Sequence, residues 1–397
     1  MPVEWLEVVR DALRSWATPM YVVAWPPVAE SLRLLGDSVG GKPVRHWLSM
    51  KTQPVRPLLR RWREEGRGVE VVSDFELAAA LVEGFEPSRI LVNGVAKQSW
   101  LSRSKASGLV VHFDSTLEIR ELVELAKRLE WRTGLRLHVR EEHDPDEPQF
   151  GTQFGLTPED AKVGVDILRS HGVAPESIHF HLRSNVEHVE SYRRALTEAV
   201  ETCRQLGLEP SYLDCGGGLP LRYAEPDGQR HDELFVSDYA RVLATSLELF
   251  PSLKELWLEN GRFLTGRAGV LVVTVLDIKN RLDCRYLICD GGRTNHALIS
   301  DWEAHRVLSI PKRMGRTCLT TVCGPNCMAY DRLIRMQLPE DIEVGDRLLW
   351  MDAGAYHLPW ESRFSHGLAN VVWYDNENGL QLARRADSFE QWWGLWR

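Results

Sequence analysis

A lysine at position 51 closes an apolar run over residues 44–50, and a proline follows at position 54. The run predicts a β-strand, and the proline predicts that this strand stops and that a helix begins near residue 55. At the carboxyl end of a parallel strand, a desolvated lysine amine can form a Schiff base with an aldehyde. The alternative is a solvated lysine at a strand end, so a catalytic Lys51 needs support from the rest of the chain.

Two further motifs follow predicted strands and offer groups that bind a phosphate or a ring. Gly216, Gly217 and Gly218 expose consecutive backbone N–H groups that a phosphate can approach, although they also fit a tight turn. Glu259 could hold a proton on a ring nitrogen, and Arg262 could bind a phosphate in a fork. A surface ion pair between these two residues is the alternative.

Histidine, cysteine and tyrosine side chains supply the remaining candidates. His179 and His181 alternate along a predicted strand, so both point to one side, where His181 could stack on a ring and Ser184 could donate to a phosphate. A metal pair is the alternative, but no carboxylate lies near them in the sequence. Cys327 lies in a predicted turn and Tyr356 follows small residues, and a buried thiol and a packed ring are the alternatives there.

The composition is typical of a soluble globular protein. The chain has 397 residues, 44% hydrophobic and 26% charged, with a net charge of −8, and it is long enough for two domains. We expect no nucleic-acid partner, because no basic stripe is present, and no metal, because the seven cysteines lack zinc-like spacing. The first residues lack a signal peptide's apolar core, and residues 268–276, the longest apolar run, are too short to span a membrane, so we expect a cytoplasmic protein.

The elements that must position these groups alternate between strands and helices. Together with the strand before Lys51, they make about eight βα units, and the pattern predicts a (β/α)8 barrel over residues 26–265. Residues 1–25 and 266–397 are predicted to form a β-rich domain, because strands joined by turns dominate after residue 265. Further strands are predicted at residues 20–25, 69–72, 89–92, 109–112, 136–139, 177–181, 212–214 and 255–258.

The order and context of these motifs resemble one family over residues 19–375. The chain resembles the alanine racemase-like (fold type III) pyridoxal-phosphate decarboxylases, which include the diaminopimelate, ornithine and arginine decarboxylases. The segments that carry the resemblance are residues 48–54 (LSMKTQP), 69–77 (VEVVSDFEL), 153–155 (QFG), 179–184 (HFHLRS), 214–218 (DCGGG), 259–262 (ENGR), 324–331 (GPNCMAYD) and 353–356 (AGAY).

The resemblance implies pyridoxal phosphate as the cofactor and a role for each matching residue. Lys51 would carry the cofactor, His181 would stack on its ring, and Glu259 would pair with the ring nitrogen. Cys327 resembles a thiol that reaches in from the other subunit and protonates the α-carbon, so the resemblance also implies a homodimer with shared active sites. The phosphate ligands and ring neighbours that it implies are Arg140, Ser184, Gly216, Gly217, Gly218, Arg262 and Tyr356.

The departures from the family pattern concern the substrate. Met328 follows Cys327, where diaminopimelate enzymes have glutamate and ornithine enzymes have aspartate. Diaminopimelate enzymes bind the distal carboxylate of the substrate with an arginine, and the matching position in this chain is near Leu298. Arg183 replaces the family's glycine and favours an acidic distal group, although it could equally face solvent. Asp331 is a further candidate for substrate binding.

We therefore expect a biosynthetic decarboxylase of a modified amino acid with an acidic distal group, such as a citryl-linked siderophore intermediate or a carrier-bound amino acid. Decarboxylation of meso-diaminopimelate is the alternative within the family. Ornithine enzymes bind the distal amine with an aspartate, and the matching position in this chain is near Asp301 or Trp302. A racemase would carry a tyrosine where this chain has its Cys327 motif, and a non-catalytic relative would lose Lys51 or the phosphate ligands.

Overall fold

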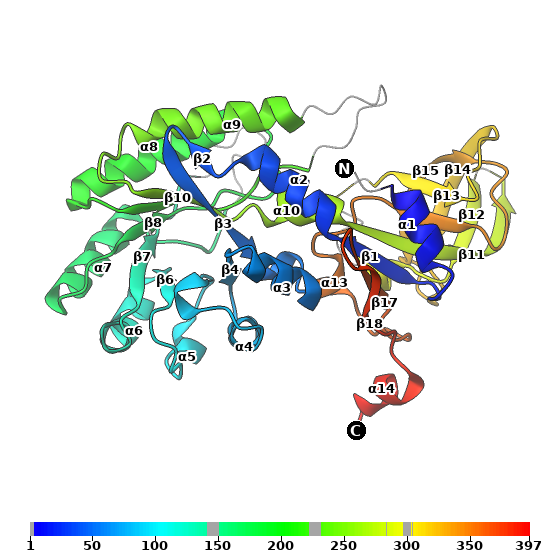
Figure 1. Cartoon of the computed structure of the whole chain (residues 1–397), viewed down its shortest axis with the longest axis horizontal. Coiled ribbons are helices and arrows are strands. Elements are labelled where there is room, and N and C mark those ends of the chain that lie inside the picture. Colours follow the sequence, from blue (N-terminus) through cyan, green and yellow to red (C-terminus); the bar gives the residue numbers. More distant parts are fainter. Residues whose placement is uncertain (1–3, 141–150, 222–231, 283, 297–302, 304) are drawn as a thin grey trace. The chain divides into compact units, whose positions relative to one another are not determined.

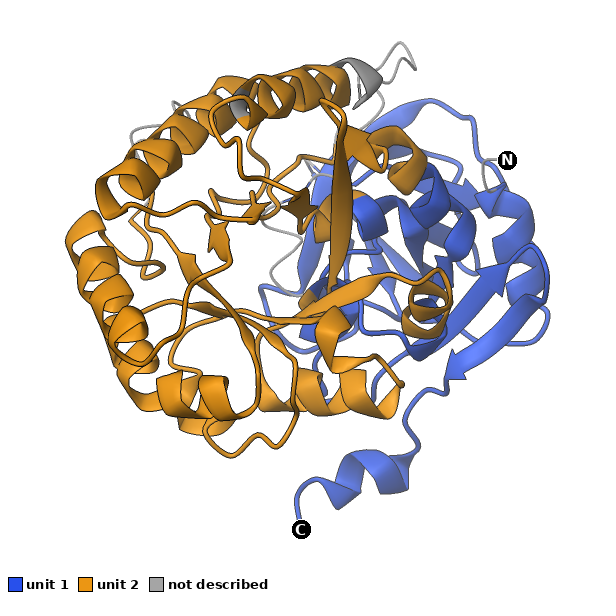
Figure 2. Ribbon diagram, turned by 60° about the vertical axis from the view of Figure 1, so that its left-hand side comes forward, with its two compact units in different colours: residues 1–30, 52–58, 264–397 blue, residues 31–51, 59–263 orange. Residues whose placement is uncertain are grey.

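The computed structural model describes residues 4–140, 151–221, 232–282, 284–296, 303 and 305–397, and the chain forms two compact units (Figures 1 and 2). The barrel unit comprises residues 31–51 and 59–263. The β unit comprises residues 1–30, 52–58 and 264–397. The predicted fold class, a (β/α)8 barrel with a β-rich domain after it, is confirmed.

The barrel unit is built on parallel strands that close on themselves. Each strand pairs with its neighbours in chain order, and the last strand returns to the first, with Leu256 opposite Val44. Such strands are buried on both faces and are therefore largely apolar. They are β3 (Lys42–Ser49), β4 (Gly68–Val71), β5 (Ile90–Val92), β6 (Val110–Phe113), β7 (Arg132–Arg136), β8 (Ser177–His179), β9 (Tyr212–Asp214) and β10 (Glu255–Leu258), and the short β2 (Ser38–Val39) pairs with β3.

Helices surround these strands (Figure 2). Three of the helices begin at hydroxyl caps: Ser73, Ser115 and Thr157 each accept a hydrogen bond from a backbone N–H in the first turn. The helices of this part of the chain are α2 (Trp25–Leu35), α3 (Arg56–Glu64), α4 (Asp74–Val82), α5 (Gln98–Leu101), α6 (Thr116–Arg128), α7 (Pro158–Ser170), α8 (Val189–Leu206), α9 (Asp232–Leu247) and α10 (Gly261–Thr265). The first two and the last contain residues of both units.

The position predicted for one barrel strand is wrong. The strand expected at residues 136–139 is β7, Arg132–Arg136. Its polar start and Gly134 conceal it, because glycine weakens a strand prediction. The glycine is required by packing: a Cβ there would lie 2.1 Å from Ser177 Oγ and 2.6 Å from His112 Cδ2. The neighbouring strands therefore come so close that only glycine fits at position 134, and the local sequence does not reveal this.

The β unit is a mixed sheet with β1 (Met20–Ala24) near its middle. This strand pairs antiparallel with β11 (Gly269–Arg281) and parallel with β17 (Asn370–Asp375). Met20, Val272 and Leu349 are among the fully buried residues of its core. The other elements are β12 (Cys284–Cys289), β13 (Val307–Ile310), β14 (Thr317–Cys323), β15 (Arg332–Pro339), β16 (Arg347–Trp350), β18 (Gly379–Arg384), α1 (Trp5–Ala12), α11 (Arg293–His296), α13 (His357–Trp360) and α14 (Phe389–Gly394).

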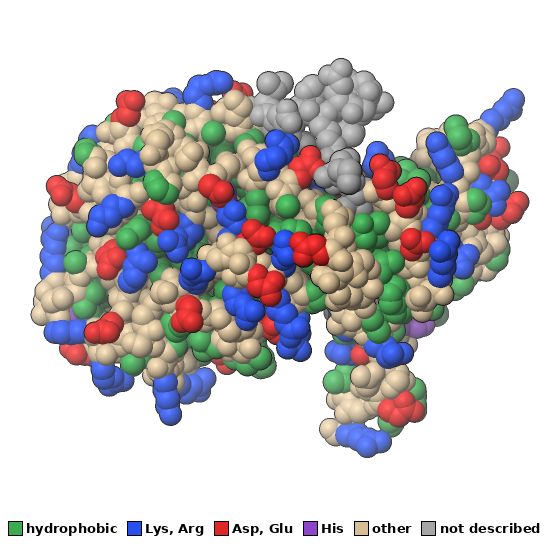
Figure 3. All heavy atoms as spheres, in the orientation of Figure 1, with side chains coloured by type: hydrophobic (Ala, Val, Ile, Leu, Met, Phe, Trp, Pro, Cys, Tyr) green, Lys and Arg blue, Asp and Glu red, His purple; other side chains and the backbone are tan. Residues whose placement is uncertain are grey.

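The surface of the barrel unit carries charges of both signs. On the face shown in Figure 3, Lys and Arg side chains are interspersed with Asp and Glu side chains. All seven cysteines are free thiols. Among the helices that the structure describes, none is both long enough and apolar enough to cross a bilayer.

Candidate active site

The amine of Lys51 lies beside a buried carboxylate at the mouth of the barrel, the edge where the carboxyl ends of the strands meet. Lys51 belongs to η1 (Met50–Thr52), the single turn that follows β3. Its Nζ lies 3.1 Å from both carboxylate oxygens of Glu70 in β4, and Glu70 also accepts a hydrogen bond from Ser49 Oγ. The Lys51 side chain is 42% exposed, whereas that of Glu70 is 1% exposed. The amine is therefore held in place and remains accessible to a ligand.

Glu259, directly after β10, is held by a chain of buried polar groups. Asn93 Nδ2 donates to Glu259 Oε1 at 2.5 Å, and Asn93 Oδ1 lies 3.0 Å from His112 Nδ1. The carbonyl oxygen can only accept, so His112 Nδ1 carries the hydrogen and Ser177 Oγ donates to His112 Nε2 at 2.9 Å. His179 Nε2 lies 3.8 Å from Glu259 Oε1. These contacts fix the direction in which the carboxylate points.

Carboxyl groups gather at the base of the mouth. Burial, with Asp214 and Glu70 adding, raises the pKa of Glu259 well above its usual value. Burial also raises the pKa of Asp214 and raises that of Glu76 to about 7, in each case against an opposing backbone N–H hydrogen bond. Such a site favours a cation or a shared proton, because desolvated carboxylates are costly without one.

His181 is fixed as a neutral ring beside the glycine turn. The Gly217 N–H donates to His181 Nδ1 at 3.1 Å, so the ring hydrogen lies on Nε2. Burial, with Arg136 and Lys51 adding, lowers the pKa of His181 to about 3. Gly216 has φ +62°, and a Cβ there would lie 2.6 Å from His181 Nδ1. The turn can therefore approach the ring only because it has no side chain.

Besides Gly216 and Gly217, the phosphate ligands predicted in the barrel unit are Gly218, Ser184 and Arg262. A Cβ at Gly218 would lie 2.6 Å from Arg183 O, and Tyr192 Oη donates to Gly217 O at 3.0 Å. Arg262 is a buried residue at the start of α10. Ser184 is exposed in the loop after β8. The guanidinium of Arg183 donates through Nη1 to Ser184 O and Asn185 O within the same loop.

Arg140, a residue that the resemblance places near the ring, lies beside Glu198 at the end of the described segment 4–140. Its side chain is 58% exposed, and its Nε lies 3.4 Å from Glu198 Oε1. The backbone N–H of Arg140 donates to the same carboxylate at 3.1 Å. Of the expected substrate positions, Leu298, Asp301 and Trp302 lie outside the described residues.

The β unit holds the remaining predicted site residues. Cys327 is exposed and Met328 is 37% exposed. Asp331 is buried, and its carboxylate accepts from the backbone N–H groups of Asn326 and Arg293, at 2.9 and 2.6 Å. These hydrogen bonds show that Asp331 shapes the turn that carries Cys327.

Tyr356 lies in a loop of the same unit. Its backbone has φ +66°, a conformation uncommon for residues other than glycine. The Tyr356 N–H donates to Thr52 O at 2.7 Å, next to Lys51 in the sequence. Gln53 Nε2 donates to Gly354 O at 2.7 Å, so the segment after Lys51 is bonded twice to the loop that carries Tyr356.

Glu70, Asn93 and His112 are site residues that the sequence did not predict. Glu70 and His112 each interrupt an apolar run of a strand that is buried on both faces. A polar residue in such a strand is the signal that could have revealed them, because a buried polar group needs a partner. No carboxylate lies near His179 in the sequence, but the fold brings Glu259 to it from the end of β10.

These groups fit pyridoxal phosphate. The accessible Lys51 amine suits its aldehyde, and the buried Glu259, which has a raised affinity for a proton, suits its ring nitrogen. His181 offers a neutral ring, and Gly216, Gly217 and Gly218 leave space that a Cβ would fill. The donor set therefore matches the covalent, charged and stacking contacts that this cofactor requires.

Replacing His112 by asparagine should flatten the pH dependence of stability. Burial lowers the pKa of His112 from 6.5 to about 3, so the unfolded chain binds more protons between these values, and stability rises with pH there. Without that histidine, the slope of the unfolding free energy should fall by up to about 1.4 kcal/mol per pH unit. Urea unfolding of the holoenzyme at several pH values below 6.5 measures the slope. The exposed His366→Asn change is the control, and equal slopes in all three proteins would contradict the prediction.

Comparison with known proteins identifies one family. Residues 30–266 match the family model of the pyridoxal binding domain of the pyridoxal-dependent decarboxylases. The probable diaminopimelate decarboxylase of Oryza sativa subsp. japonica is 26% identical over 97% of this chain and 81% of its own length. The diaminopimelate decarboxylase of Deinococcus radiodurans is 28% identical over 97% of both chains. The structure of diaminopimelate decarboxylase from Helicobacter pylori, complexed with L-lysine, has a TM-score of 0.84 at 21% identity and covers 98% of both chains.

Proposed function

Because the chain belongs to the pyridoxal-dependent decarboxylase family, we propose that it removes the α-carboxylate of a diamino acid and that meso-diaminopimelate is its substrate. The protein is a pyridoxal-phosphate-dependent carboxy-lyase. The substrate proposal is supported by relatives along almost the whole chain that are named diaminopimelate decarboxylases. Meso-diaminopimelate thus takes the place of the conjugated amino acid that the sequence led us to expect. The expected acidic distal group is kept, since diaminopimelate carries a carboxylate at each end.

The reaction type is supported by an accessible amine, Lys51, and a buried carboxyl group, Glu259, that follow neighbouring strands of the barrel. When bound, the cofactor supplies the electron sink for the pair of electrons that CO2 leaves behind. Lys51 binds the cofactor aldehyde, and Glu70 orients its amine from 3.1 Å. Glu259 would stabilise a proton on the ring nitrogen, because a buried carboxylate is favoured by a positive charge placed beside it. His181, neutral and fixed by Gly217, supports one face of the ring.

The predicted β-rich domain, residues 1–25 and 266–397, would complete the active site of a partner subunit in a homodimer. Cys327 is exposed, and its turn is shaped from within by Asp331. A thiol in that position can give its proton to the α-carbon after CO2 has left. Tyr356 would bind the cofactor phosphate together with Arg262, Ser184 and the glycine turn, and Arg140 would lie near the ring. A reduced chain with free thiols fits a cytoplasmic location.

Replacing Cys327 by alanine should slow turnover and leave the cofactor bound. The exposed thiol is the proposed proton donor, and loss of a general acid costs about 10²- to 10⁴-fold in rate. CO2 release and product composition are measured beside the visible absorbance of the cofactor. Cys318→Ala, in β14, is the matched control. Unchanged turnover and product in the Cys327 variant would remove this role.

The substrate is tested by CO2 release from a panel of amino acids. The purified, cofactor-loaded protein is given meso-diaminopimelate, L- and D-lysine, ornithine, arginine, glutamate and citryl-linked diamino acids. We expect CO2 and lysine in equal amounts from meso-diaminopimelate, and far slower release of CO2 from the other compounds of the panel. Release from arginine or ornithine instead would overturn it, and a racemase would invert an amino acid without any CO2.

One residue favours a second candidate, the decarboxylase of a conjugated amino acid. Met328 follows Cys327 in place of the family's acidic residue, so this position offers no carboxylate to a distal ammonium group. Activity on a citryl conjugate, with none on meso-diaminopimelate, would establish that candidate. The panel is repeated with Arg183→Gly, and an unchanged preference between acidic and basic substrates would exclude Arg183 as the group that binds the distal carboxylate.

A further inference from the structure

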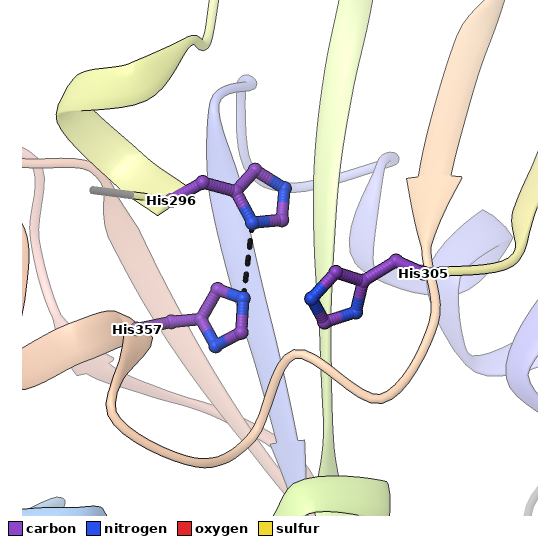
Figure 4. Close-up of side chains that lie close together, drawn as sticks. All are labelled: His296, His305 and His357. Carbon is purple, nitrogen blue, oxygen red and sulfur yellow. Dashed lines mark hydrogen bonds between the residues drawn. The ribbon is translucent and has the colours of Figure 1, made fainter. Parts of the chain in front are cut away.

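Three histidines that the proposed reaction does not use meet inside the β unit (Figure 4). His296 ends α11, His305 precedes β13 and His357 begins α13. They are 0%, 4% and 0% exposed, and one ring nitrogen of each lies within 4.8 Å of the others. In Figure 4 the ring of His305 faces the pair formed by the other two. Imidazole nitrogens this close together form a set of ligands for a metal ion.

Hydrogen bonds to backbone carbonyls orient two of the rings. His305 Nδ1 lies 2.8 Å from Met351 O, and His357 Nδ1 lies 2.9 Å from Ala355 O. A carbonyl oxygen only accepts, so each Nδ1 carries the hydrogen, and each Nε2 of the neutral ring carries a lone pair. Histidines that bind metals are held in this way, with the second ring nitrogen donating to a carbonyl or carboxylate.

The third ring is incompletely satisfied by the protein. His296 Nδ1 lies 3.0 Å from His357 Nε2, which is an acceptor, so His296 donates there. His296 Nε2 is buried and has no hydrogen-bond partner among the described residues. A buried nitrogen left in this state costs about 1–3 kcal/mol, which a buried water at Nε2 offsets whether or not an ion binds at Nδ1.

A carboxylate lies beside the cluster and can supply a fourth ligand. The Glu303 side chain is 4% exposed, and its Oε2 lies 3.8 Å from His305 Nε2. One carboxylate with three neutral imidazoles balances part of the charge of a divalent ion, which lowers the cost of burying it. Three nitrogens and one oxygen also complete a tetrahedral set, the arrangement of closed, structural zinc sites.

We propose that His296, His305 and His357, with Glu303, bind a divalent transition-metal ion of the zinc class. Tetrahedral bonds of about 2.1 Å place ligand atoms roughly 3.4 Å apart, so the three histidine nitrogens, now 3.0 to 4.8 Å apart, need only a small closing movement. Glu303 must approach the ion from its place beside His305. His296 moves its hydrogen from Nδ1 to Nε2 when Nδ1 binds the ion, and no proton leaves the protein. The ion joins three segments of the β unit and fixes the residue that follows Tyr356.

The competing explanation is a packed polar cluster without an ion. The ring of His296 contacts Trp350 edge to face, with centroids 4.7 Å apart, which is a normal core contact. A buried water could satisfy His296 Nε2. This explanation predicts that the protein takes up no metal, so metal content separates it from the proposal.

The first experiment measures metal in the untagged, full-length protein. Inductively coupled plasma mass spectrometry of protein purified without chelator is expected to find about one zinc ion per chain. Protein stripped with a chelator should take up Zn²⁺ again with the same stoichiometry and melt at a higher temperature when loaded. Co²⁺ in the same site should give the strong visible bands of tetrahedral coordination. Failure of the stripped wild-type protein to bind either ion stoichiometrically would overturn the proposal.

Variants of the cluster test whether the Zn²⁺ ion binds to these histidines. His305→Asn and His357→Asn should each weaken Zn²⁺ binding by about 100-fold or more, because each removes a ligand. His366→Asn, an exposed histidine of the same unit, is the control and should bind as the wild type does. Unchanged affinity in the two cluster variants would place the ion elsewhere and contradict the proposal. The wild-type measurement decides alone if these variants do not fold, and it does not depend on decarboxylase activity.

Discussion

The Lys51→Ala protein is expected to lose turnover and the visible absorbance of bound cofactor. The Lys51 amine is accessible at the mouth of the barrel and lies 3.1 Å from Glu70. It is the only primary amine proposed for the site, so no other proposed group can form a Schiff base with an aldehyde. We expect a loss of about 10⁴-fold or more in the rate of CO2 release, the scale of removing a covalent catalyst. Stopped assays of CO2 release and an absorption spectrum of the purified variant measure both effects.

A matched variant separates the amine from its positive charge. Lys51→Arg keeps a cation beside Glu70, which is 1% exposed, but its guanidinium does not form a Schiff base. The arginine variant should be as inactive as the alanine variant and more stable. Lys105→Ala, an exposed lysine of the same unit, should behave as the wild type does. An active, coloured Lys51→Ala protein would show that another residue holds the cofactor.

Glu259→Gln is expected to slow decarboxylation by about 10²- to 10³-fold with a much smaller loss of cofactor affinity. Glutamine keeps the shape and can still accept the hydrogen bond from Asn93 Nδ2. It cannot stabilise a positive charge on a ring nitrogen, so the electron sink is weakened while the other cofactor contacts stay. The two effects are measured as the rate of CO2 release and as the dissociation constant of pyridoxal phosphate.

The control for Glu259 is a second glutamate of the same strand. Glu255 begins β10 and forms an ion pair with Arg45 at 3.1 Å, away from the carboxyl end of the strand. Glu255→Gln should leave the rate of CO2 release nearly unchanged. Equal losses of rate and of cofactor affinity in Glu259→Gln would show that Glu259 only binds the cofactor.

The sequence predicted the parts of the site that lie in short continuous motifs. Lys51 before a proline, the turn at Gly216 to Gly218 and the Glu259 motif each follow a strand, and the barrel collects strand ends at one edge. The barrel itself was predictable because apolar strands alternate with helical stretches. The position of β7 was not predictable, because Gly134 is required by close contact with side chains of the neighbouring strands.

Contacts between distant strands could not be predicted in the same way. Asn93 joins Glu259 to His112 across strands β5, β6 and β10, and which side chains meet depends on the register of the barrel. The histidine cluster is a stronger case. His296, His305 and His357 have no metal-like spacing, so the sequence predicted no metal, and only the fold of the β unit brings their rings together.

The most direct test of the account is to locate the cofactor on the chain. The holoenzyme is reduced with borohydride, which fixes a lysine-bound pyridoxal group, and the digested protein is analysed by mass spectrometry. The pyridoxyl group is expected on the peptide that contains Lys51 and should be absent from the Lys51→Arg protein. A pyridoxyl group on another lysine, or on none, would contradict the assignment of the barrel mouth as the active site.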